Sequence, residues 1–349
     1  MDVRLNPQVR ANPYTTSISG ITRTSVRKGS VMHERIVVSG GSGFIGRLLT
    51  GKLVASNYDV VVLTRSPLPA VGAIRQVRWD GRTLDSWTEE LDGARALINL
   101  AGRSVNCRYN ERNRREILES RVDSTRVLGE AIARCNRPPR EWLNASTATI
   151  YKHTFDRPMD EATGVIAATP EAKDAFSIEV AEAWEQTLHE AHTPATRKVA
   201  LRTAMVFAPG EGGVFRVLRR LTRYGLGGPV AGGNQFMSWI HEDDFCRAVE
   251  WLIGRDELSG PVNIASPNPI PHRDMMKILR RECRVPFGLP ATRWMLEVAA
   301  FVHRTEAELI LKSRRVVPGR LLASGFQFRF PRMEDAVREI ERRVHGHAS

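Results

Sequence analysis

The chain has 349 residues, of which 42% are hydrophobic, enough to bury a large core in one large domain or two closely joined ones. No run approaches the roughly 20 apolar residues of a membrane span, and the four cysteines form no C-x-x-C pair, which argues against a membrane protein, a metal site and a disulfide framework. Of the formal charge of +12, the first 31 residues carry +4, from five basic residues and one acid. The remaining excess is spread among short arginine pairs with acids between them, so an anionic ligand is expected and a nucleic-acid partner is not.

The first 31 residues form a basic segment that is rich in Ser, Thr, Arg and Asn and shows no apolar period. We expect residues 1–31 to be a disordered arm. Its composition resembles an organelle presequence, although we prefer a dispensable tail ahead of an alternative start at Met32. The few, widely spaced cysteines fit a reducing compartment, so a cytoplasmic location is expected.

An apolar strand at residues 35–39 runs into a glycine cluster and then into a helix whose apolar residues recur at helical spacing. A sharp turn, a close approach of the backbone to a pyrophosphate and tight helix–sheet packing each favour a residue without a Cβ. Two spacings fit, Gly41/Gly43/Gly46 as G-x-G-x-x-G and Gly40/Gly43/Gly46 as G-x-x-G-x-x-G. Because the helix points its free N–H groups and positive dipole end at this turn, the pattern predicts a dinucleotide-phosphate site.

A second apolar strand at residues 59–65 ends about 20 residues beyond the last glycine, which completes a βαβ unit. NAD-binding proteins usually carry an Asp or Glu at the end of this strand, where it accepts hydrogen bonds from the ribose 2′-hydroxyl. Here the positions hold Thr64 and Arg65, and a guanidinium can hold a 2′-phosphate with two hydrogen bonds. NADP(H) is therefore expected rather than NAD(H), the alternative being that Arg65 simply faces solvent.

A buried strand at residues 96–100 continues into two small residues, which let the backbone lie along a cofactor. After a charged helix at 110–134, the strand at 142–146 runs into hydroxyl-bearing residues, at the sheet edge where α/β enzymes carry their active sites. The predicted cofactor contacts come from the glycine loop and from the ends of two strands, namely Gly40, Ser42, Gly43, Phe44, Ile45, Gly46, Thr64, Arg65, Leu100, Ala101 and Gly102.

Strands and helices continue to alternate up to a glycine-bearing loop at residues 208–213. This alternation predicts an α/β fold with a doubly wound parallel sheet of the Rossmann type. Loops and short strands follow, including one strand at 236–241, and a last sheet strand is expected at 262–265. The chain beyond residue 271 reads mainly as helices, and the last of them carries an apolar stripe formed by Met333, Val337, Ile340 and Val344.

Four segments together resemble the extended short-chain dehydrogenase/reductase superfamily: the glycine loop, Asn99-Leu100-Ala101-Gly102, the residues from Ser146 to Tyr151, and those from Trp239 to Asp244. A narrower similarity is to an epimerase-like family that ends in a small C-terminal domain of unknown function. It rests on Gly225-Leu226-Gly227-Gly228-Pro229 and on Pro318-Gly319-Arg320-Leu321 with Gly325-Phe326-Gln327-Phe328.

The resemblance implies an NADP(H)-binding Rossmann domain at residues 32–270, with interleaved substrate-domain segments near 208–240, and a smaller, mainly helical substrate domain at 271–349. It also implies the Gly40/Gly43/Gly46 register. The expected activity is that of an NADP(H)-dependent oxidoreductase or nucleotide-sugar epimerase acting on a small carbonyl or sugar-like molecule. The expected partners are this unidentified small-molecule substrate and, in a homodimer, a second copy of the chain; no membrane partner is expected.

Enzymes of this superfamily use a Tyr-x-x-x-Lys pair for proton transfer and ribose binding. No tyrosine in this chain has a lysine four residues later. Superposing the family pattern puts Ala175 and Glu179 at the two positions and Arg121 where an asparagine is usual. A catalytically impaired NADP(H)-binding sensor or regulatory partner is therefore the alternative function.

The catalytic residues predicted are Thr147 and Tyr151. Thr147 matches the superfamily hydroxyl that binds a substrate oxygen. Tyr151 could replace the missing acid, but Lys152 beside it points the other way on a strand, so a packed, structural ring is preferred. His241 could move protons near neutral pH, yet its place before two acids also predicts a cap on the next helix, which we prefer.

Overall fold

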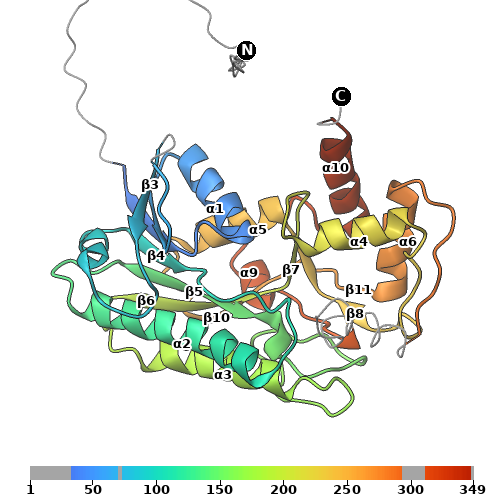
Figure 1. Ribbon diagram of the computed structural model, residues 1–349, viewed down its shortest axis with the longest axis horizontal. Coiled ribbons are helices and arrows are strands. Elements are labelled where there is room, and N and C mark those ends of the chain that lie inside the picture. The colour runs from blue at the N-terminus through green and yellow to red at the C-terminus, as the bar shows by residue number, and fades with distance from the viewer. Residues whose placement is uncertain (1–32, 70–72, 293–310, 347–349) are drawn as a thin grey trace, which may run out of the picture. The chain divides into compact units, whose positions relative to one another are not determined.

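The computed structural model describes residues 33–69, 73–292 and 311–346, so the predicted arm at 1–31 lies outside the described residues. Seven parallel strands form the central sheet in the order β10-β6-β5-β4-β1-β2-β3 (Figure 1). The order reverses between β1 and β4, which confirms the doubly wound Rossmann-type arrangement. The strands are β1 (Arg35–Ser39), β2 (Asp59–Thr64), β3 (Ile74–Arg78), β4 (Ala96–Asn99), β5 (Glu141–Thr147), β6 (Arg197–Thr203) and β10 (Gly260–Ile264).

Helices cover both faces of this sheet (Figure 1). On one face α1 (Phe44–Ala55) and α5 (Glu242–Leu252) enclose a core with Ile36 and Val38 of β1. On the other face, Val37 of the same strand belongs to a second core with α2 (Glu111–Ala133), beside which α3 (Ala175–Glu190) packs. Successive residues of β1 thus fill opposite cores, as expected for a parallel strand buried on both sides.

The later segments build a third core of their own. It joins β7 (Met205–Phe207), β9 (Trp239–His241), α4 (Val214–Arg223), α6 (His272–Glu282) and α10 (Met333–Gly346). The predicted stripe on α10 is confirmed, since Met333, Val337 and Ile340 are buried there and Val344 packs against them. Segments near 208–240 and beyond 271 therefore share one core, whereas the domain boundary at residue 270 stays a prediction.

The strand expected at 236–241 is in fact two short strands that belong to different sheets. β8 (Phe236–Met237) pairs antiparallel with β11 (Ile270–Pro271), whereas β9 pairs parallel with β7. Ser238 separates them because its hydroxyl donates to Arg314 O at 2.6 Å and accepts from Val316 N at 2.8 Å. These bonds to the chain at 314–316, just before the short helix α9 (Gly319–Ala323), interrupt what would otherwise be one strand.

None of the described helices is both long and apolar enough to cross a membrane.

Candidate functional site

The glycine loop between β1 and α1 is shaped by backbone contacts that leave no room for side chains. Gly40 has φ +72°, and a Cβ on it would lie 2.7 Å from the carbonyl carbon of Leu100. A Cβ on Gly46 would lie 2.5 Å from Gly40 O, and Gly43 N donates to that same oxygen at 3.0 Å. Gly41 is also tight, but its missing Cβ faces the Val62 side chain of β2. Gly40, Gly43 and Gly46 therefore make the turn, while Gly41 serves sheet packing.

The first turn of α1 is open to an anion. Its N-cap is Gly43, no side chain caps the turn, and no acidic residue occupies it. The N–H groups of a first helical turn have no partner within the helix, and the dipole adds partial positive charge there. Ile45 turns its side chain to the core, so it can offer only its backbone to a ligand. This end of α1 has the geometry of a phosphate-binding turn.

The ring of Phe44, at the start of α1, lies under the glycine-bearing loop 208–213. A Cβ on Gly213 would lie 2.6 Å from Phe44 Cζ, and one on Gly210 would lie 3.3 Å from Phe44 Cε2. The glycines of this loop are thus required for close packing on the ring. The structure brings together a predicted cofactor residue and a segment predicted to belong to the substrate domain.

The end of β2 lies beside the glycine loop. The Thr64 side chain is nearly buried, and its Oγ1 is 3.4 Å from the Oγ of Ser42. Arg65 is exposed and forms no hydrogen bond or ion pair with any other residue in the described part of the chain. A free guanidinium and two hydroxyl groups therefore stand where an NAD-binding protein usually carries an acid.

A buried amide network links the ends of β1 and β4 to the middle of β5. Asn99 accepts from the Ser39 hydroxyl at 2.7 Å and from Ala101 N at 3.0 Å, and it donates to Asn144 Oδ1 at 2.7 Å. The network holds the backbone of Leu100 and Ala101 against the glycine loop, at the point where the strand order reverses. The sequence indicates Asn99 only as part of a family motif, and its role in positioning the backbone of Leu100 and Ala101 is visible only in the structure.

Arg121 lies against Gly102, just past the end of β4. A Cβ on Gly102 would be 3.3 Å from Arg121 Cζ. The guanidinium donates to the carbonyl oxygens of Arg103 and Ile117 and stacks on Trp184 at 5.1 Å. Burial lowers the pKa of Arg121 to about 10, so the group remains charged at neutral pH. The position where the superfamily pattern has a neutral asparagine thus carries a positive charge.

Thr147 ends β5 and is half-buried at the carboxyl edge of the sheet. Its Oγ1 accepts a hydrogen bond of 3.1 Å from Thr149 N, which starts a short helical turn. A hydroxyl oxygen that accepts through one lone pair still has its proton to donate. Thr147 is therefore poised to donate a hydrogen bond to a ligand oxygen.

Tyr151 is only 1% exposed, and its hydroxyl group is fully engaged. The hydroxyl donates to Asn263 Oδ1 at 2.9 Å and accepts from Arg202 Nη1 at 2.9 Å. Arg202 in turn forms a two-bond ion pair with Glu185. Burial raises the pKa of Tyr151, although Arg202 acts in the opposite direction. These contacts support the structural alternative for Tyr151, and Lys152 beside it is exposed.

The C-terminal segment 312–314 reaches the same sheet edge from a distant part of the sequence. Lys312 is 1% exposed, lies 2.6 Å from Asp174 Oδ2 and donates to Thr149 O at 2.6 Å. Arg314 donates to Thr149 Oγ1 at 3.0 Å. These side chains fix the turn that follows Thr147, and no sequence signal pointed to them.

Ala175 and Glu179, at the positions of the superfamily pair, are both exposed on the first two turns of α3. Neither side chain forms a hydrogen bond or an ion pair within the described part of the chain. His241 is 2% exposed and caps α5, since its Nδ1 accepts from Asp243 N at 3.1 Å. Its Nε2 pairs with Glu339 at 2.9 Å, so the preferred capping role of His241 is confirmed.

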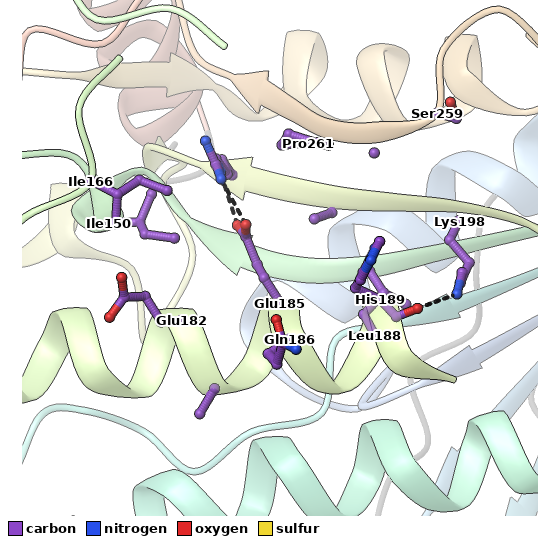
Figure 2. A pocket seen from close by; sticks show the side chains of 14 residues that line it. Ile150, Ile166, Glu182, Glu185, Gln186, Leu188, His189, Lys198, Ser259 and Pro261 are labelled. Carbon is purple, nitrogen blue, oxygen red and sulfur yellow. Dashed lines mark hydrogen bonds and ion pairs between the residues drawn. The ribbon is translucent and has the colours of Figure 1, made fainter. Parts of the chain in front are cut away.

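A separate groove of about 840 Å³ lies between α3, β6 and β10 (Figure 2). In Figure 2, Glu185 reaches from α3 toward the strands, and Lys198 bonds to the backbone of His189. None of the predicted site residues lines this groove.

Residues 36–265 match the model of the NAD dependent epimerase/dehydratase family. The chain belongs to this family. Residues 291–340 also match a domain of unknown function, DUF1731, which agrees with the C-terminal domain expected from the sequence. Both parts of the resemblance are thereby confirmed.

Named members and relatives of the family match nearly the whole length of their own chains. The human epimerase family protein SDR39U1 is 29% identical over 315 residues, which cover 88% of this chain and 99% of the human protein. The epimerase family protein YfhF of Bacillus subtilis is 27% identical over 312 residues, covering 87% and 97% of the two chains.

Two solved structures are similar to this fold. The crystal structure of human SDR39U1 (isoform 2) with NADPH has a TM-score of 0.76 at 28% identity, covering 88% of this chain and 99% of the human one. A nucleoside-diphosphate sugar epimerase from Corynebacterium glutamicum has a TM-score of 0.68 at 26% identity, covering 89% of this chain and 59% of that protein.

Proposed function

We propose that the protein binds NADP(H) and acts as an oxidoreductase or nucleotide-sugar epimerase-like enzyme on a small carbonyl or sugar-like substrate. The observation that carries this proposal is the glycine turn, where the close packing at Gly40 and Gly46 leaves the N–H groups of the first turn of α1 open to an anion. At the end of β2, an unpaired Arg65 stands where NAD-binding proteins usually carry an acid. The presence of NADPH in the structure of the human relative supports the choice of cofactor.

The groups of this chain that would serve the reaction lie at the carboxyl edge of the sheet. NADPH, when bound, supplies a hydride to the carbon of a carbonyl group. Thr147 donates a hydrogen bond to the oxygen that gains negative charge, and Arg121, which lies against Gly102 past the end of β4, contributes a positive charge to the same edge of the sheet. Water supplies the proton that completes an alcohol. The chemistry thus proceeds with an orienting hydroxyl and a fixed cation in place of the tyrosine and lysine.

The test combines cofactor binding with turnover. NADPH is titrated by fluorescence, and purified protein is then assayed with NADPH on carbonyl compounds and with UDP-sugars. We expect Thr147→Val to abolish turnover while leaving NADPH affinity unchanged, and Thr147→Ser to retain turnover because it keeps the hydroxyl. Gly43→Asp places a carboxylate at the first turn of α1 and should abolish binding. Tight NADPH binding without turnover of any substrate would refute the enzymatic proposal.

We propose, as a second function, that the protein is an NADP(H)-binding sensor that regulates a partner protein. The specific observation is that the superfamily tyrosine position holds Ala175, which has no functional group. The hydroxyl of Tyr151, the candidate replacement, is buried and bonded to Asn263 and Arg202. This function predicts that NADPH changes partner affinity. Pull-downs whose bound fraction is the same with and without NADPH would argue against it.

A further inference from the structure

The last residues of β2 and β3 lie side by side, because the register pairs Thr64 with Arg78. Laterally paired residues of neighbouring strands direct their side chains to the same face of a sheet. The Thr64 hydroxyl faces Ser42 of the glycine loop at 3.4 Å. Arg78 is therefore directed to the glycine-loop side of the sheet, next to the strand end that carries Arg65.

Arg78 and Arg65 differ from Arg75 and Arg82 in having no counter-charge. Arg75, on the same strand as Arg78, forms an ion pair with Glu90, and Arg82 pairs with Glu119 and Asp123. In the described part of the chain, Arg78 and Arg65 make neither hydrogen bonds nor ion pairs, and both are exposed.

The acid closest in sequence to Arg78 is engaged elsewhere. The carboxylate of Asp80 accepts from Arg82 N at 2.8 Å, from Thr83 N at 2.9 Å and from the Thr83 hydroxyl at 2.7 Å. These bonds lower the pKa of Asp80 against the effect of its partial burial. Asp80 therefore directs its hydrogen bonds into the turn 80–83 and forms no ion pair with Arg78.

We propose that Arg78 is a second specificity-determining residue for NADP(H), which grips the adenosine 2′-phosphate together with Arg65. A phosphate monoester carries close to two negative charges at neutral pH, so two guanidinium groups match it better than one. The hydroxyl groups of Ser42 and Thr64 complete the set of donors. This inference rests on the proposed binding of NADP(H) and extends it to a residue on the third strand.

The experiment measures dissociation constants for NADPH and NADH by fluorescence on the full-length protein. We expect Arg78→Ala and Arg65→Ala each to weaken NADPH binding roughly tenfold or more, as for the loss of a hydrogen-bonded charge, with NADH binding unchanged. Arg78→Glu should reverse the preference so that NADH binds more tightly. Arg75→Ala, three residues earlier on β3 and facing Glu90, is the matched control and should leave both constants unchanged.

Competition by 2′,5′-ADP, which carries the 2′-phosphate, and by 5′-AMP, which does not, identifies the group that Arg78 binds. Arg78→Ala should weaken the binding of 2′,5′-ADP and leave that of 5′-AMP unchanged. A wild-type protein with equal affinity for NADPH and NADH would refute the proposed cofactor and the role of Arg78 together. A wild-type preference for NADPH that is lost in Arg65→Ala but kept in Arg78→Ala would overturn the role of Arg78 alone. Unchanged NADH affinity in each variant shows that the fold is intact.

Discussion

Arg202 donates a 2.9 Å hydrogen bond to the hydroxyl group of Tyr151 in the interior of the protein. Because Arg202 lies on β6 and the second partner, Asn263, lies on β10, the tyrosine ties together the ends of three neighbouring strands. The hydroxyl group therefore has a structural role, since both of its hydrogen bonds link neighbouring strands.

Tyr151→Phe should destabilise the protein without changing cofactor affinity. The substitution leaves buried polar atoms of Arg202 and Asn263 without a partner, which costs about 1–3 kcal/mol of unfolding free energy. Urea denaturation measures the loss, and fluorescence titration measures NADPH binding. Tyr224→Phe, on a ring that is 75% exposed, is the control and should be neutral. If Tyr151→Phe instead removed turnover at unchanged stability, Tyr151 would be the acid after all.

Two glycines in α1 should respond in opposite ways to substitution by alanine. A Cβ on Gly46 meets Gly40 O at 2.5 Å, so Gly46→Ala must displace the phosphate-binding turn and should weaken NADPH binding at least tenfold. Gly51 has nothing within 4 Å of its Cβ position, and Gly51→Ala should stabilise the helix by about 0.5–1 kcal/mol with binding unchanged. Equal NADPH affinities in the two variants would contradict the assignment of the turn.

The buried pair of Lys312 and Asp174 should couple the C-terminal segment to the start of α3. Lys312→Met leaves a buried carboxylate without its partner and should cost about 3–5 kcal/mol of unfolding free energy. Asp174→Asn removes the charge but keeps an oxygen for Thr169 N, so the double variant should lose less than the sum of the two single losses.

Arg126→Met serves as the comparison for that cycle, because Arg126 forms an exposed pair with Glu130. Its effect should stay within about 0.5 kcal/mol. Additive losses in the Lys312 and Asp174 cycle would show that the two side chains do not interact.

His272, at the start of α6, should make stability depend on pH. Burial lowers the pKa of His272 to about 4, below its ordinary value of 6.5. Between these two values the unfolded chain binds a proton that the folded protein does not, so stability is full above pH 6.5 and falls as the pH drops toward 4. The loss is at most about 1.4 kcal/mol per pH unit.

Denaturant unfolding at several pH values between 7 and 4 measures this dependence. His272→Gln keeps an acceptor for Val230 N and should flatten the slope relative to the wild type. His192→Gln, at an exposed position, should leave the slope unchanged. A His272→Gln slope identical to that of the wild type would contradict the neutral, buried state of the ring.

Local sequence patterns predicted much of this fold because they depend on neighbouring residues. The apolar run before Gly40 and the helical period after Gly46 define β1 and α1 without reference to the rest of the chain. By contrast, the strand expected at 236–241 is divided because Ser238 bonds to residues 314–316, which no local pattern can reveal.

The sequence by itself determined the family, the parallel α/β fold, the glycine turn and the lack of a Tyr-x-x-x-Lys pair, since each depends on residue types at short, fixed spacings. Only the tertiary structure decided that Tyr151 is buried against Arg202, that Lys312 meets Asp174, and that Arg78 stands beside Thr64. The physical reason is that hydrogen bonds and ion pairs between distant residues depend on strand order and register. These are set by the packing of the whole sheet, and not by any one segment.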